Sequence, residues 1–355
     1  MAVLLLTVSL PSCKGSPRQH TENAVVATNF ALYDLARQAY PGDCVMLLSP
    51  GTESHDFECT LADMATIAQA RLVLYGGGEG DDWMDDVLAR IAEAGEPVPY
   101  LRAMDVIAGE SELLHEAEAL ESDGHDHDHA DHDHDDHDHG DDHDHADHDT
   151  AAEGDHESYR NAADAILHKN TNIYVRTALP EVSYDGYDEH VWTDPANAIL
   201  LLHAIGDALD ALGLPTNDTT AYADRLLAVD EAYRSLAAEG GLTHLLFADR
   251  FPFLYFEKEY GLEFHPAYSG CSDESDVSAG VIAGLIKTVK DEKIPVVFMT
   301  ELSSGRIAQT VSAATGAEIL TLHSCSNVSK AEAEAGETYL SLMRRNNENL
   351  KTALG

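Results

Sequence analysis

Short apolar runs alternate along the chain with stretches whose apolar residues recur at helical spacing. Runs of four to eight apolar residues are typical of buried strands, and a period near 3.6 is typical of amphipathic helices. In the first part of the chain the apolar runs predict strands over 25–30, 44–48 and 71–75. Helices are expected over 31–40, 60–70 and 81–94.

The same alternation returns after a long helical pattern over 217–239, which follows the turn-like Gly213-Leu214-Pro215. Strands are then expected over 242–247, 295–300 and 318–322, and helices over 253–260, 277–290, 304–315 and 330–354. Such alternation predicts an α/β fold of two lobes, each a mostly parallel sheet flanked by helices, joined by one long rigid helix. The expected units are a signal or tether over 1–24, a first lobe over 25–216, a connecting helix over 217–240 and a second lobe over 241–355.

Composition changes abruptly within the first lobe, because residues 125–149 are only His, Asp, Ala and Gly. Such a segment cannot bury apolar surface and is expected to be a mobile loop. Neutral imidazole favours zinc, copper and nickel, so the loop should bind several metal ions weakly and exchange them quickly. A solvated acidic linker without a metal role is the alternative. The histidines of the tract are His125, His127, His129, His132, His134, His137, His139, His143, His145 and His148.

The net charge limits which classes of binding partner are expected. The chain of 355 residues has 21 Lys plus Arg against 64 Asp plus Glu, a formal net charge of −43. This excess argues against nucleic acid and anionic membrane surfaces, and it favours cations. No run reaches the roughly 18–20 apolar residues that span a bilayer, so no integral membrane segment is expected.

The N-terminus and the cysteines bear on export. The apolar run of the first twelve residues stops at Cys13, an order that resembles the end of a bacterial lipoprotein signal whose cysteine is lipidated. A basic region is missing, and Pro11 stands where a small residue is usual, so a chance cysteine is the alternative. The four other cysteines lack zinc-finger spacing. Disulfides Cys44–Cys59 and Cys271–Cys325 would keep each bridge within one half of the chain, and four reduced buried cysteines are the alternative if the protein is not exported.

Three histidines outside the tract are placed where a precise metal site could form. His55 lies in the loop after a predicted strand, His190 lies in YDEHVWTDP before a predicted helix, and His323 ends the strand EILTL. Each alone is more often structural or exposed than a ligand. Their joint placement at strand ends and in loops of both halves favours a metal site.

Several longer segments carry a family resemblance. VVATNFALYDLARQ, LLSPGTESHDFECTLADMATIAQARLVLYGGG, YDEHVWTDPANA and YFEKEYGL occur in the order found in zinc and manganese solute-binding proteins of bacterial ABC transporters. The acidic His-rich insertion resembles that of the zinc-specific members. The resemblance covers nearly all of residues 25–355. It implies a two-lobed receptor with a rigid connecting helix and a metal site buried between the lobes.

The resemblance also implies ligands, with two departures. His55 and His190 match the first two family histidines, whereas the third falls on Arg250, which stays protonated and cannot coordinate a cation. His323 stands at the family's C-terminal aspartate. We therefore expect zinc on His55, His190 and His323, with Asp249 or water as the fourth ligand. Glu301 and His265 are weaker candidates, and three nitrogens favour Zn²⁺ over Mn²⁺.

The predicted function is extracytoplasmic capture of zinc and its delivery to the membrane subunit of an ABC permease. The expected receptor is a monomer, either periplasmic or held at the membrane by a lipid anchor only, and it is not an enzyme. One alternative is a zinc hydrolase, although HExxH, GxSxG, P-loop and GxGxxG motifs are missing from the sequence. A surface adhesin or metal-storage lipoprotein of the same fold is the other alternative.

Overall fold

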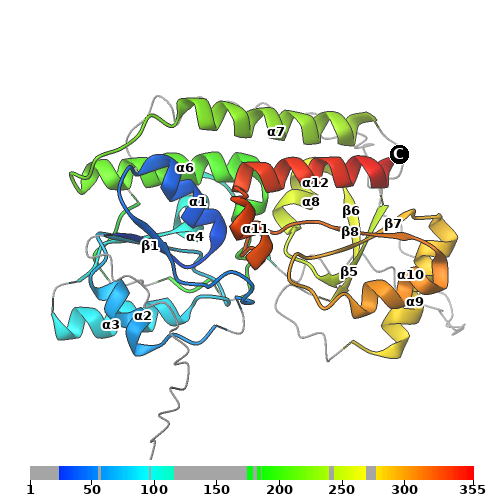
Figure 1. Ribbon diagram of the computed structural model, residues 1–355, viewed down its shortest axis with the longest axis horizontal. Coiled ribbons are helices and arrows are strands. Elements are labelled where there is room, and N and C mark those ends of the chain that lie inside the picture. Colours follow the sequence, from blue (N-terminus) through cyan, green and yellow to red (C-terminus); the bar gives the residue numbers. More distant parts are fainter. Residues whose placement is uncertain are drawn as a thin grey trace, which may run out of the picture.

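The structure is a computed structural model of the chain. It describes residues 24–54, 57–95, 97–115, 174–178, 182–184, 186–239, 244–268 and 277–355. Two four-stranded parallel sheets, one in each half of the chain, form the centres of two lobes that lie side by side (Figure 1). The predicted fold class is therefore confirmed.

The first sheet has the strand order β2-β1-β3-β4, and all its pairings are parallel. Alternate residues of β1 face different cores: Val25 and Ala27 belong to one cluster of buried side chains and Val26 to another. Helices therefore have to cover both faces of the sheet. The elements are β1 (Val25–Ala27), α1 (Phe30–Ala39), β2 (Cys44–Met46), α2 (Leu61–Ala68), β3 (Leu72–Tyr75), α3 (Trp83–Ala94), β4 (Tyr100–Arg102) and α4 (Ala103–Glu110).

The second sheet has the order β6-β5-β7-β8 and is also parallel. Its two faces also pack against different cores. Leu246 and Ala248 of β5 face one core, and Leu245 and Phe247 face the other. The elements are β5 (His244–Arg250), α8 (Leu254–Tyr260), β6 (Glu263–Tyr268), α9 (Ala279–Glu292), β7 (Val296–Met299), α10 (Arg306–Thr315), β8 (Glu318–Thr321), α11 (Lys330–Ala335) and α12 (Tyr339–Leu354).

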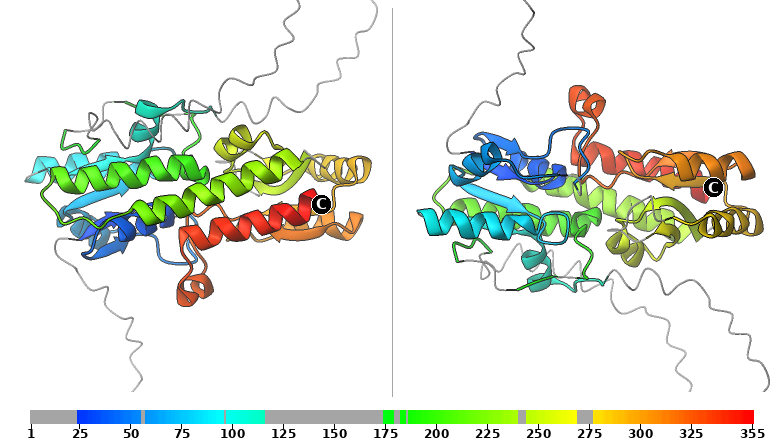
Figure 2. Two further views of the ribbon diagram at one scale, coloured as in Figure 1. Left: turned by 90° about the horizontal axis from the view of Figure 1, so that it is seen from above. Right: turned by 90° about the horizontal axis from the view of Figure 1, so that it is seen from below.

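A layer of long helices connects the lobes. The segment between the sheets includes η2 (Val191–Thr193), α6 (Pro195–Ala211) and α7 (Thr220–Glu239), so the predicted long helix is present. Figures 1 and 2 show α7 extending over both lobes, with α6 beside it over the first lobe and α12 over the second. Buried side chains of both sheets and of these three helices belong to one continuous core. This shared core holds the two lobes together.

Local sequence signals explain several helix ends. The side chain of Asn29 accepts a hydrogen bond from the backbone N–H of Leu32 and caps α1. Thr60 and Asp63 form a capping box at the start of α2. The single helix predicted over 330–354 is wrong, since Gly336 adopts a left-handed conformation and ends α11, and Thr338 starts α12 with a capping box.

Two other expectations need correction. β4 and β6 are not among the predicted strands, because they are short and contain charged or polar residues, Arg102 and Glu263 among them. The predicted Cys44–Cys59 disulfide is wrong, because both thiols are free. Cys44 packs against the core on one face of the first sheet and Cys59 against the core on the other, so the sheet separates them.

Cys325 is a free and fully buried thiol, and burial raises its pKa well above the ordinary value. Its predicted partner Cys271 lies outside the described residues, as do Cys13 and the His-rich tract over 125–149. Within the described part of the chain, no helix combines the length and apolar character needed to cross a membrane.

A buried carboxyl in α8 leads to the first testable prediction. Burial raises the pKa of Glu257 to about 7, although the backbone N–H of Phe264 donates to its Oε1 at 3.1 Å. The folded chain therefore binds this proton more tightly than the unfolded chain. The contribution of Glu257 to stability is complete below about pH 4.5, the ordinary value, and is lost as the pH rises through about 7.

Glu257→Gln retains an acceptor for Phe264 and removes the titration. Relative to the wild type, the variant should gain about 1–3 kcal/mol of unfolding free energy between pH 5 and pH 8. Urea unfolding followed by circular dichroism at both pH values measures the difference. Glu318→Gln, at an exposed position of β8, is the matched control and should show no such gain. An equal pH dependence in Glu257→Gln and wild type would contradict the prediction.

Candidate metal centre

A cavity of about 30 Å³ lies between the lobes, where strands of both sheets reach their carboxyl ends. One water molecule requires roughly 10–15 Å³, so the space suits a metal ion with a water molecule. The first half of the chain contributes Glu53, Ser54 and His190. The second half contributes Arg250, Pro252, Thr300, Glu301, Leu302, Ser324, Ser326 and Asn327.

His190 has the surroundings of a metal-ligating histidine. It immediately precedes η2, and its side chain is almost completely buried. Its Nδ1–H donates to Asp188 Oδ1 at 2.7 Å, and its backbone N–H donates to the same oxygen at 2.9 Å. The ring of Trp192 packs edge-on against the imidazole, with 5.6 Å between centroids. The hydrogen bond to the carboxylate places the ring lone pair on Nε2 and fixes the ring orientation, as carboxylates bonded to metal-ligating histidines do.

Glu301 brings a carboxylate to the opposite wall of the cavity. Its Oε2 accepts from the backbone N–H of Ser324 at 2.9 Å, and its Oε1 accepts from the Ser324 hydroxyl at 2.7 Å. These bonds hold the carboxylate beside the loop that follows β8. The weaker candidate of the sequence analysis is thus the acidic side chain of the second lobe that lines the cavity.

Arg250 also lines the cavity, at the end of β5. Its guanidinium is permanently charged and has no lone pair to offer a metal. The neighbouring Glu53 and Glu301 supply two negative charges. The wall therefore combines one fixed positive charge with two carboxylates and the imidazole of His190.

Asp249 is absent from the cavity lining, contrary to its predicted role as a ligand. Its Oδ1 accepts from the Tyr268 hydroxyl at 2.8 Å and from the backbone N–H of Arg250 at 2.9 Å. Its Oδ2 accepts from the hydroxyl of Thr300 at 2.8 Å and from its backbone N–H at 3.1 Å. Four hydrogen bonds occupy both oxygens. Asp249 therefore ties the ends of β5, β6 and β7 together.

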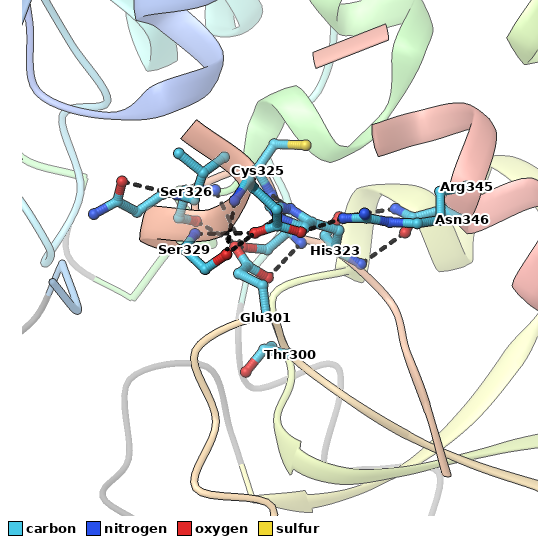
Figure 3. Close-up of polar contacts among 12 residues, drawn as sticks. Thr300, Glu301, His323, Cys325, Ser326, Ser329, Arg345 and Asn346 are labelled. Carbon is cyan, nitrogen blue, oxygen red and sulfur yellow. Dashed lines mark hydrogen bonds and ion pairs between the residues drawn. The ribbon is translucent and has the colours of Figure 1, made fainter. Parts of the chain in front are cut away.

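His323, another predicted ligand, is fully buried and does not line the cavity. Figure 3 shows it within a cluster of polar contacts that also contains Glu301 and Asn346. The side-chain amide of Asn346 in α12 accepts a hydrogen bond from the backbone N–H of His323 at 2.7 Å and donates one to its backbone carbonyl at 2.8 Å. The backbone N–H of Cys325 donates to His323 Nδ1 at 3.0 Å. His323 Nδ1 also lies 3.5 Å from Glu301 Oε1, so the imidazole contacts the carboxylate that lines the cavity.

The other side of the His323 ring faces α11. Its Nε2 lies 3.5 Å from Glu332 Oε2, and this imidazole is the largest cause that lowers the pKa of Glu332 well below its usual range. Arg345 pairs with Glu332 from α12. His323 is therefore a structural residue that connects the loop after β8 to two helices.

Two predicted ligands remain, His55 and His265. His55 is outside the described residues, although its neighbour Ser54 lines the cavity. His265 belongs to β6 and lies near the amino end of that strand, away from the cavity. Sequence reasoning missed Asp188, although the motif DEHVW already contained a carboxylate two residues before His190.

A second group of buried carboxylates supports the first-lobe side of the site. Asp81 accepts from the Thr28 hydroxyl and from the backbone N–H groups of Gly76 and Gly77, all at 2.7 Å. Glu189 accepts from the backbone N–H of Gly80 at 2.7 Å, and burial raises its pKa to about 7. A Cβ at position 80 would lie 2.3 Å from Glu189 Oε1, so glycine permits this approach.

Two parallel-sheet lobes with a polar cavity between their strand ends define the class of two-lobed binding proteins. The family described as "Zinc-uptake complex component A periplasmic" (ZnuA) matches residues 25–353, nearly the whole chain. The chain belongs to this family.

Curated relatives agree with the family. The chain is 25% identical to the zinc-binding lipoprotein AdcA of Streptococcus pneumoniae serotype 4 over 355 residues, which cover 98% of this chain and 59% of that protein. It is 23% identical to the high-affinity zinc uptake system protein ZnuA of Bacillus subtilis, with 97% and 91% covered. The chain thus spans little more than half the length of the AdcA proteins it matches.

Solved structures share the fold. Zn(II)-bound AdcA of S. pneumoniae superimposes with a TM-score of 0.63 at 22% identity, covering 94% of this chain and 58% of that one. The periplasmic zinc-binding protein TroA of Treponema pallidum gives 0.60 at 18% identity, covering 94% and 100%.

The four hydrogen bonds of Asp249 lead to a stability prediction. Asp249→Ala should lower the unfolding free energy by about 2 kcal/mol, because the half-buried donors of Thr300 and Tyr268 lose the acceptor that joins them. Urea denaturation monitored by tryptophan fluorescence measures this loss. Asp43→Ala, in an exposed turn, is the control and should stay within about 0.5 kcal/mol of the wild type. Wild-type stability of Asp249→Ala would show that the carboxylate does not hold the strand ends.

Proposed function

We propose that the protein captures zinc outside the cytoplasmic membrane and delivers it to the membrane subunit of an ABC permease. The observation that carries the proposal is His190, whose Nδ1–H is held by Asp188 while the residue lines a cavity between the lobes. Membership of a zinc-uptake family supports zinc as the bound ion. The names of the relatives, among them a zinc-binding lipoprotein and a zinc uptake protein, support the direction of transport.

The proposed zinc ligands are His190 and Glu301 from the described residues, together with His55 next to Ser54. Two imidazoles and one carboxylate are a common zinc donor set, and a water molecule can complete a tetrahedron. The charge balance also fits, because Glu53 and Glu301 carry two negative charges and Arg250 one positive charge. The net negative wall attracts a divalent cation and leaves an excess positive charge when the ion is bound. Part of that excess can favour release to the next carrier.

The protein in this proposal is a receptor and not a hydrolase. The relevant units are a first lobe over 25–216, the connecting helix over 217–240 and a second lobe over 241–355. The protein acts as a monomer, anchored at the membrane through a lipid on Cys13 or free in the periplasm. The tract over 125–149 binds zinc weakly and keeps it in rapid exchange.

The ligand proposal is tested with substitutions at three positions. His190→Ala should weaken zinc binding at least 100-fold, since a bond to the ion is lost, and Asp188→Asn should weaken it about 10- to 100-fold. Arg250→Ala is the matched control in the same wall and should bind zinc as tightly as the wild type or more tightly. Competition with a chromogenic chelator at pH 7.5 gives the affinities. Equal losses for all three variants would refute the assignment of His190.

The role of the tract is tested by deleting residues 125–149. The repetitive His and Asp sequence of the tract offers many similar weak zinc sites and no single defined one. Its removal should therefore eliminate most weak zinc sites and keep one tight site. Isothermal titration calorimetry separates the two classes by affinity and stoichiometry. Disappearance of the tight site would contradict the assignment of the cargo site to the cavity, and uniformly weak binding in the full chain would favour metal storage.

A further inference from the structure

Two histidines and two glutamates meet at the end of the second sheet that is opposite the cavity. His244 begins β5, and Glu263 begins β6, and these two residues are directly paired in the parallel register. His265 lies two residues after Glu263 and therefore projects to the same face of the sheet. Glu292, the last residue of α9, approaches both histidines from the helix that packs on this face.

The distances between the donor atoms match those of a tetrahedral zinc site. His244 Nδ1 lies 3.3 Å from His265 Nε2 and 3.5 Å from Glu263 Oε2. Glu292 Oε2 lies 3.6 Å from His265 Nε2 and 3.9 Å from His244 Nδ1. Ligands bonded at about 2.0–2.1 Å to a tetrahedral ion are roughly 3.4 Å apart. The atoms of His244, Glu263 and His265 all lie within 4.8 Å of one another.

Hydrogen bonds within the cluster cannot satisfy both imidazoles and both carboxylates. The two imidazole rings stack with an interplanar angle of 12°, and their facing nitrogens can share only one proton between them. A carboxylate oxygen of each glutamate also faces His244 Nδ1, at 3.5 Å for Glu263 and 3.9 Å for Glu292. A cation at the centre would satisfy both nitrogen lone pairs and both carboxylates at once, and the carbonyl end of α9 would add a favourable dipole.

Exposure of the four side chains permits entry of an ion from solvent. His244, Glu263 and Glu292 are exposed by 40, 42 and 37%, whereas His265 is exposed by 15% and anchors the group in the sheet. Two imidazoles favour late first-row transition metals over magnesium and calcium, which prefer oxygen ligands.

We propose that His244, Glu263, His265 and Glu292 form a second zinc site on the second lobe, separate from the cavity between the lobes. Because the ligands come from β5, β6 and α9, the bound ion cross-links the amino end of the sheet to the helix that covers it. The proposal does not depend on the transport function, since no residue of this group lines the cavity.

The test follows individual histidines in the full chain, so that zinc bound by the His-rich tract does not obscure the result. Diethyl pyrocarbonate modifies imidazole nitrogens that are not bonded to a metal, and peptide mass spectrometry assigns the modified residue. Added zinc should slow modification of His244 at least fivefold, and magnesium at the same concentration should have no effect. Equal modification with and without zinc would refute the site.

Variants of the other ligands show whether zinc protects His244 by coordination or by shielding it in a general way. Glu292→Gln, at a partly exposed helix end, and His265→Gln should both abolish the protection of His244 by zinc. His203→Gln is the matched control, because His203 is a half-buried histidine of α6 outside the group, and protection of His244 should persist there. Circular dichroism verifies that each variant is folded. Protection that survives in folded Glu292→Gln and His265→Gln would overturn the proposal.

Discussion

The parallel direction of the strands determines where polar side chains can gather in this protein. Both four-stranded sheets are parallel, so the carboxyl ends of the strands in each sheet lie at one edge. The loops that leave these edges supply the wall of the cavity, including Arg250, Thr300 and Ser324. The amino ends form the opposite edge of each sheet, and there β5 and β6 bring His244 and Glu263 side by side.

The loop after β8 connects this arrangement to the first lobe. Phe30 and Ala31 at the start of α1 donate their backbone N–H groups to the carbonyls of Ser326 and Cys325. The side chain of Asn327 donates to the carbonyls of Ser49 and Thr52. The residues that hold Glu301 in the cavity wall thus belong to the segment that binds the lobes together.

His323 stabilises that loop from behind. Cys325 has a φ of 62°, which is unusual for a residue with a side chain, and its N–H is held by His323 Nδ1. The imidazole of His323 thus accepts a hydrogen bond within the protein. Arg250 differs from His323 because it lines the cavity and places a permanent positive charge there.

The sequence alone determined the fold class, the long helix and the position of His190, because apolar periodicity and short motifs are local properties. It named Glu301 and His265 only as weaker candidate ligands of one site, and the tertiary structure places Glu301 in the cavity wall and His265 in β6, away from the cavity. Tertiary structure decided which strand-end residues face the cavity. Asp249 and Arg250 are neighbours, yet Tyr268 and Thr300 hold the Asp249 carboxylate among the strands while Arg250 lines the cavity. Asn346, which fixes the backbone of His323, lies 23 residues further along the chain. Side-chain direction at these positions depends on hydrogen-bond partners distant in sequence, which no local pattern specifies.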